Sequence, residues 1–209
     1  MRRVEIAAAV KGERQKLVRE LAGINHDAWD AQSLCEEWRV RDVVGHLIRL
    51  GDWNRRPHLA ARDLLGSRFR TNRALSEAAR RIGNAPPDQL LERLEDTRYE
   101  EALTFRLHPQ PLFALAEWIV HGQDIRRPLG LTTSFEPNAL KAVAEVSTKW
   151  YTWGGRQRRR AERFEATDTD WATGEGPPVL RGPLEAIVMV LFARDVAMID
   201  LQADSVGDC

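Results

Sequence analysis

The chain has 209 residues and a mass of 23.8 kDa, and its 31 basic and 31 acidic residues leave a formal net charge of zero. This balance argues against a protein built mainly to neutralise nucleic-acid phosphates or anionic lipid. A hydrophobic fraction of 43 % and a charged fraction of 30 % are ordinary for a globular protein and exclude a wholly disordered chain. The two cysteines, Cys35 and Cys209, are too few for a disulfide framework and suit a reducing cytoplasm.

The apolar segments of the sequence are short. The longest run, from Ala186 to Ala193, is well below the roughly 20 residues that a helix needs to span a bilayer. Near the N-terminus the apolar stretch is interrupted by Glu5 and ends at Lys11, so a cleaved signal is not expected. The sequence therefore predicts a cytoplasmic protein without a membrane segment.

Residues up to about position 153 carry the spacing of amphipathic helices, with apolar side chains recurring at intervals of three and four. The sequence predicts one helix that ends near Gly23, one that begins near Val40, and four more over residues 72–82, 88–98, 111–127 and 137–153. Asp42 lies in the first turn of the second helix, where a carboxylate complements the helix dipole. This pattern predicts a four-helix-type bundle over residues 1–153.

The pattern changes in residues 154–209. Alternating residues predict short strands over 163–167 and 179–180, separated by turn residues around Gly174. A final apolar helix is predicted over residues 183–203. The whole chain is therefore predicted to be mainly α, a helical bundle followed by a small α+β C-terminal appendage.

The helix predicted over residues 111–127 carries the most informative polar residues. At 100° per residue, Glu117, His121 and Asp124 fall within about 60° of one another, on a helix that is otherwise apolar. A narrow solvent-facing stripe is one explanation of this pattern. The other is a metal site, because two ligands one helical turn apart can converge on a single ion.

His46 is a second candidate ligand. It lies beside the apolar face formed by Val43 and Leu47, where a lone histidine is more often a hydrogen-bonded core residue. If it faced Glu117 and His121 across the bundle, the three would form a His₂Glu set with an open position. That is the ligand count of a catalytic zinc site rather than of a closed structural one.

Two runs carry a family resemblance, CEEWRVRDVVGHL at residues 35–47 and EWIVHGQDIRRPLG at residues 117–130. Together they resemble the mycothiol-dependent maleylpyruvate isomerase family, which belongs to the DinB-like superfamily of metal-binding four-helix bundles. The tail over residues 166–195 is similar to the C-terminal part of these proteins. The resemblance implies a divalent metal, usually zinc, held by His46, Glu117 and His121, and mycothiol as cosubstrate.

The resemblance also implies an activity: a thiolate made available by the metal adds to a small electrophilic substrate, giving isomerisation or S-transfer. Such chemistry needs no protein nucleophile, so Cys35 is interpreted as a small packing residue. Asp124 is a candidate partner that orients a ligand histidine. Arg126 and Arg127 could hold an anionic substrate or thiol, or could serve as cations at a helix C-terminus.

Other functions remain open at this stage. A hydrolase or amidase on the same bundle would use a metal-bound water, with Asp124 as the candidate base. Two further alternatives are not enzymes. One is a metal-binding protein without catalytic activity, and the other is a nucleic-acid binder that uses the arginines at positions 156 and 158–160. Residues 154–209 are interpreted as a trimmed second domain, and the sequence leaves open whether the chain forms a homodimer.

Overall fold

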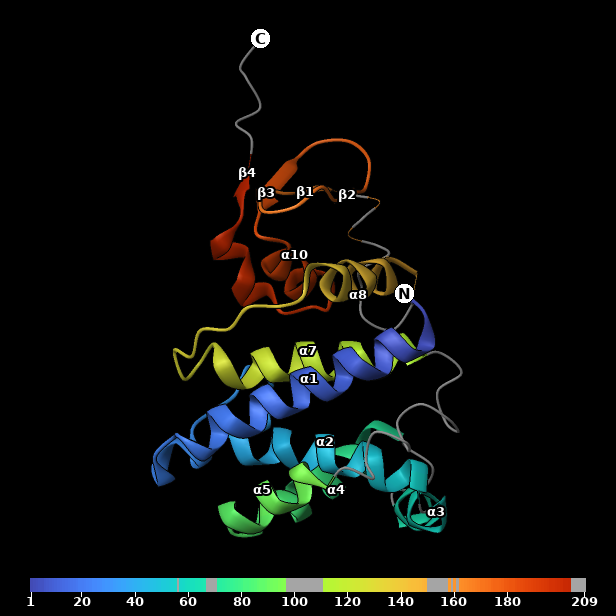
Figure 1. Cartoon of the computed structure of the whole chain (residues 1–209), viewed down its shortest axis with the longest axis vertical. Coiled ribbons are helices and arrows are strands. Elements are labelled where there is room, and N and C mark those ends of the chain that lie inside the picture. Colours follow the sequence, from blue (N-terminus) through green and yellow to red (C-terminus); the bar gives the residue numbers. More distant parts are fainter. Residues whose placement is uncertain are drawn as a thin grey trace. The chain divides into compact units, whose positions relative to one another are not determined.

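The computed structural model of the chain (Figure 1) describes residues 1–55, 57–66, 71–96, 111–149, 158, 160 and 162–203. The contacts between residues group the chain into two compact units, one of residues 2–133 and one of residues 134–209. The domain boundary after residue 153 stays a prediction, although the last helix before it makes its contacts inside the second unit. Within the described ranges, no helix is both long and apolar enough to cross a membrane.

The first unit is a helical bundle, which confirms the predicted fold class. Its elements are α1 (Arg3–Ala22), the 3-10 helix η1 (His26–Asp30), α2 (Val40–Arg55), α3 (Pro57–Gly66), α4 (Thr71–Gly83), α5 (Pro87–Glu95) and α7 (Pro111–Arg126). Helix α2 packs against α3, α4, α5 and α7, while α1 packs against α5 and α7. Figure 1 shows α1 lying along α7 with α2 beside them. The short elements α3 and η1 were not predicted from the sequence.

Helices α2 and α7 differ in how their apolar residues are distributed around the helix. In α2 one face is apolar, and Val43 and Val44 on it are fully buried. The helix start is held by Asp42, whose carboxylate accepts hydrogen bonds from the backbone and the guanidinium of Arg39. Helix α7 is apolar around most of its circumference, and Trp118 is 1 % exposed. A helix of this kind lies inside the bundle, so its few polar side chains are brought into the interior with it.

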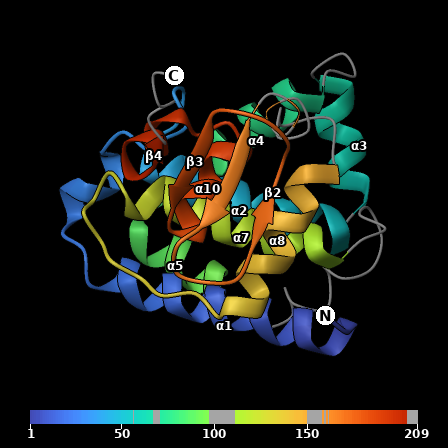
Figure 2. The same ribbon diagram turned by 90° about the horizontal axis from the view of Figure 1, so that it is seen from above.

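The second unit joins two helices to a small sheet. Its elements are α8 (Pro137–Lys149), β1 (Arg163–Ala166), β2 (Ala172–Thr173), β3 (Val179–Gly182), α10 (Leu184–Leu191), η2 (Asp195–Asp200) and β4 (Gln202–Ala203). The strand order is β2-β1-β3-β4, with β1 and β3 parallel and the outer pairs antiparallel. Helix α10 packs against α8 and β1, as Figure 2 shows from above the sheet.

The predicted helix over residues 183–203 is wrong in its length, because α10 ends at Leu191. Ala193 adopts a left-handed conformation with φ of 63°. The backbone N–H of Ala193 donates to Val190 and that of Arg194 donates to Met189, which closes the helix with a Schellman motif. No glycine or proline marks this end in the sequence, so the periodic pattern alone runs past it.

We expect Ala193→Gly to stabilise the C-terminal unit by about 1 kcal/mol, because a left-handed conformation costs an L-residue that much and glycine nothing. Differential scanning calorimetry should show a rise in Tm of roughly 2–4 °C. Ala142→Gly, at a helical position of α8, is the matched control and should lower Tm. A fall in Tm for both variants would contradict this explanation of the helix end.

Candidate metal centre

Three predicted residues come together inside the helical bundle. His46 lies on α2, and Glu117 and His121 lie one turn apart on α7. Oε2 of Glu117 is 3.2 Å from Nε2 of His46 and 3.1 Å from Nε2 of His121. One ligand atom from each residue lies within 4.8 Å of those of the other two. The spacing on α7 follows from the helical repeat, whereas His46 arrives through the packing of α2 on α7.

The cluster is almost, but not fully, closed to solvent. The exposed fractions of the three side chains are 7 % for His46, 18 % for Glu117 and 13 % for His121. The two imidazole rings meet edge to face, with centroids 4.6 Å apart. The surroundings of the centre are therefore mostly protein, while a part of each side chain stays accessible to solvent.

Trp38 lies beside the cluster and was not singled out from the sequence. Its ring centroid lies 4.9 Å from that of His46 and 6.1 Å from that of His121. The indole N–H donates to Oγ of Ser76 on α4, at 3.1 Å, which fixes the ring. Trp38 stands in the same sequence run as His46, so the motif contained it without revealing its position.

Burial and hydrogen bonding set opposite charges within the cluster. Burial lowers the pKa of His46 below its ordinary value and keeps its ring neutral. Burial would raise the pKa of Glu117, but the hydrogen bonds from His121 and His46 outweigh it and hold that pKa far below its usual range. Burial would lower the pKa of His121, but hydrogen bonds with Asp124, Cys35 and Glu117 hold it well above the usual value. A divalent cation would compete with the proton on His121.

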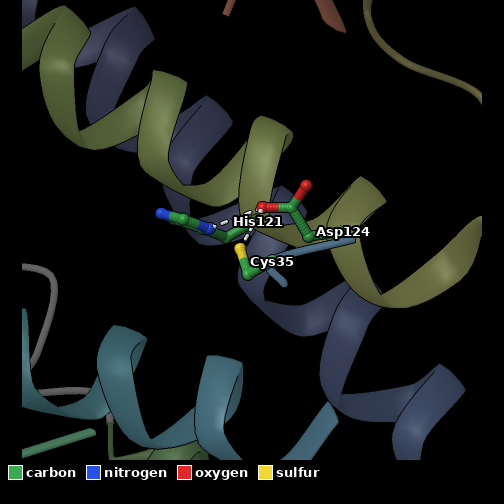
Figure 3. Close-up of side chains that lie close together, drawn as sticks. All are labelled: Cys35, His121 and Asp124. Atoms are coloured by element: carbon green, nitrogen blue, oxygen red, sulfur yellow. Dashed lines mark hydrogen bonds and ion pairs between the residues drawn. The ribbon is translucent and has the colours of Figure 1, made fainter. Parts of the chain in front are cut away.

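Asp124 contacts the ring of His121, and its role as a partner that orients a metal ligand stays a prediction. Its Oδ2 accepts a hydrogen bond from Nδ1 of His121 at 2.8 Å, and its side chain is fully buried. The same oxygen accepts a second hydrogen bond from Sγ of Cys35 at 3.2 Å (Figure 3). The sequence interpretation of Cys35 as a packing residue missed this contact, because 89 positions separate it from Asp124.

The other predicted polar residues lie elsewhere in the structure. Asp42 caps the start of α2 through Arg39, which agrees with its interpretation as a helix-start residue. Arg126 is fully buried, and its Nε donates to Glu20 of α1 at 2.6 Å. Arg127 is half-buried. The binding of an anionic substrate or thiol by Arg126 and Arg127 stays a prediction, and the structure gives Arg126 a partner within the bundle.

The arginines at positions 156 and 158–160 are only partly described. Arg158 forms an ion pair with Asp195, and Arg160 is exposed. Positions 156 and 159, like Cys209, lie outside the described residues.

The residues present fit a divalent metal. Two imidazoles and one carboxylate are the donor types that zinc prefers, and three protein ligands leave a further position for a small molecule. Nδ1 of His46 is buried without a hydrogen-bond partner among the described residues, so its ring is not committed to a purely structural network. The hydrogen bond from Nδ1 of His121 to Asp124 is the usual outer contact of a metal-ligating histidine.

The fold and the cluster together define a helical-bundle protein with two histidines and a glutamate gathered in its interior. A family model described as the mycothiol maleylpyruvate isomerase N-terminal domain matches residues 10–126, more than half of the chain. The chain belongs to this family. The match confirms the resemblance inferred from the two sequence runs.

Two solved structures share this fold. They are crystal structures of the mycothiol-dependent maleylpyruvate isomerase and of a histidine-to-alanine mutant of it, which are 16 % and 15 % identical to this chain, each with a TM-score of 0.71. Each comparison covers 100 % of this chain and 95 % of the other, and the interpretation of residues 154–209 as a trimmed second domain stays a prediction. A search of curated proteins found no match.

Proposed function

We propose that the protein is a divalent-metal-dependent enzyme that uses mycothiol to isomerise, or to transfer sulfur to, a small electrophilic substrate. Two observations support the proposal: the family to which the chain belongs, and the convergence of His46, Glu117 and His121. A bound zinc ion would lower the pKa of a thiol and so supply a thiolate at neutral pH. Because the similar solved structures are named as maleylpyruvate isomerases, maleylpyruvate, an acid with a cis double bond, is the first substrate to test.

The side chains of the centre have separate roles in this proposal. His46, Glu117 and His121 would hold the metal, and the negative charge of Glu117 would offset part of its positive charge. By accepting a hydrogen bond from Nδ1 of His121, Asp124 would keep that proton in place and leave the lone pair of Nε2 for the metal. Trp38 packs beside the rings of His46 and His121 and limits how far they can turn.

The thiol supplies the nucleophile, so the chain itself need not. In isomerisation the thiolate sulfur adds to one carbon of the conjugated double bond, the resulting single bond rotates, and the sulfur leaves with its electron pair. The double bond then forms again in the other geometry. In S-transfer the sulfur stays on the substrate and a proton from water completes the product.

The hydrolase alternative needs a carboxylate that can take a proton from water beside the centre. Asp124 was the candidate base, but its side chain is fully buried and accepts hydrogen bonds from His121 and Cys35. This arrangement favours a role in orienting His121 over a role as base, and it favours the thiol reaction.

We expect the metal-free protein to bind one zinc ion per chain and to convert maleylpyruvate only when mycothiol and zinc are both present. Isothermal titration measures the binding, and absorbance measures the conversion with and without thiol. Absence of zinc binding would contradict the metal centre. Equal turnover with and without thiol would contradict the thiol reaction and favour a hydrolase.

A further inference from the structure

Cys35 lies in the loop that connects η1 to α2, and several hydrogen bonds hold that loop in place. Nε2 of Gln32 donates to the carbonyl oxygens of Cys35 and Trp38 at 2.8 and 3.0 Å. Oγ of Ser33 donates to the carbonyl oxygen of Trp38 at 2.6 Å and accepts from the backbone N–H of Cys35 at 3.1 Å. Because Gln32 and Ser33 each hold the loop separately, the loss of either side chain leaves the contacts of the other in place.

The same loop is attached to α7 beside the metal centre. The backbone N–H of Leu34 donates to the carbonyl oxygen of Asp124 at 3.0 Å. One residue further on, the thiol of Cys35 donates to Oδ2 of Asp124 at 3.2 Å. Two adjacent residues thus hold the backbone and the side chain of Asp124.

Both side-chain donors meet at one carboxylate oxygen. Oδ2 of Asp124 accepts from Nδ1 of His121 and from Sγ of Cys35, and Figure 3 shows the three side chains converging. The direction in which this oxygen points decides how the imidazole of His121 is turned about its own bonds. A donor that holds the oxygen in place consequently also holds the ring.

We propose that Cys35 is a positioning residue: its thiol fixes the carboxylate of Asp124, which fixes the ring of His121 toward the metal centre. The inference rests on the proposed function only in taking His121 as a metal ligand. It replaces the interpretation of Cys35 as a small packing residue, and it differs from a nucleophilic role because the thiol hydrogen is directed at Asp124.

The size of the effect follows from the place of Cys35 in the chain of contacts. Loss of an outer hydrogen-bond partner of a ligand typically weakens metal binding about 10- to 100-fold. The thiol of Cys35 acts mainly through Asp124, although it also lies against His121 itself, and a thiol is a weak donor. We therefore expect Cys35→Ala to weaken zinc binding by up to about tenfold, below the cost of losing Asp124 itself.

Three variants separate the hydrogen bond from the loop that carries it. Cys35→Ala removes the donor, and Cys35→Ser restores a donor of similar shape. Ser33→Ala is the matched control, because it removes hydrogen bonds of the same loop without touching the side chain of Asp124. Circular dichroism establishes that each variant is folded.

Two measurements apply to each variant. Zinc titration of the metal-free protein gives the Kd, and nuclear magnetic resonance of the metal-free protein follows the Nδ1–H signal of His121. We expect Cys35→Ala to raise the Kd and to shift this signal, and Cys35→Ser to bring both back close to the wild-type values. Ser33→Ala should leave the signal in place.

Each other outcome overturns the inference. Unchanged Kd and unchanged His121 signal in Cys35→Ala would show that the thiol positions nothing, and equal effects of Cys35→Ala and Cys35→Ser would show that volume matters instead of the donor. An equal effect of Ser33→Ala would assign the role to the loop. If the wild type binds no zinc, the proposed function fails, while the His121 signal still decides whether Cys35 orients the ring.

Discussion

Replacing His121 by alanine is expected to weaken zinc binding by at least about a hundredfold and to abolish thiol-dependent turnover. The substitution removes one of three proposed ligands, and loss of a ligand costs more than the 10- to 100-fold typical of an outer partner. It also leaves the fully buried carboxylate of Asp124 without its hydrogen bond from Nδ1. The measurements are the zinc Kd by titration and the rate of conversion with mycothiol present.

Because His121→Ala is also expected to lower the stability of the fold, a second variant is needed to separate loss of zinc binding from loss of stability. In His121→Asn the side-chain N–H₂ can take the place of Nδ1 toward Asp124, while the nitrogen proposed to bind the metal is gone. We expect this variant to keep its fold and still lose zinc. His26→Ala is the matched control, because His26 is exposed on η1, and it should bind zinc as the wild type does. Wild-type affinity in His121→Asn would remove His121 from the metal centre.

The spacing along α7 was enough to predict part of this centre. Glu117 and His121 share a face because four residues make about one helical turn, and this holds wherever the helix lies. Apolar residues at intervals of three and four likewise predicted most helices of the bundle, and alternating residues predicted both central strands of the sheet. These are local features, in which each residue constrains neighbours a few positions away.

The contacts that complete the centre are not local. His46 and Glu117 are 71 positions apart, and Cys35 and Asp124 are 89 apart, so only the packing of α2 and its preceding loop on α7 brings them together. A resemblance to known proteins predicted His46, since a motif records the outcome of that packing. It did not reveal the roles of Cys35 and Trp38, because nothing in the motif separates a residue beside the centre from one inside the core.

The end of α10 shows a second feature that could not be predicted from the sequence. The residues that follow Leu191 include Phe192, Ala193 and Val196, all compatible with a helix. The turn at Ala193 is formed by backbone hydrogen bonds, and the chain then leads into β4, which pairs with β3. Local propensity is overruled here by the pairing of the sheet, so the extent of the helix could not be read from periodicity.

The crossing of α2 and α4 gives the last prediction. A Cβ atom added at Gly45 would overlap the carbonyl oxygen of Ala79 and would lie 2.8 Å from the backbone nitrogen of Gly83. Both obstacles are backbone atoms, which cannot turn aside as a flexible side chain can. Gly45→Ala must therefore push α2 away from α4, at a cost of about 1–3 kcal/mol or more in the free energy of unfolding.

The displacement should also reach the metal centre, because Gly45 directly precedes His46 and metal ligands must be held to within about 0.5 Å. We expect Gly45→Ala to unfold at lower urea concentration and to bind zinc at least about tenfold more weakly than the wild type. Gly12→Ala is the matched control: nothing lies within 4 Å of the added Cβ on α1, so this variant should gain about 0.5–1 kcal/mol and keep its zinc affinity. A Gly45→Ala protein as stable as the wild type would show that α2 and α4 do not cross as closely as the structure has them. Lost stability with unchanged zinc affinity would show that the position of α2 does not determine the position of His46 in the proposed metal centre.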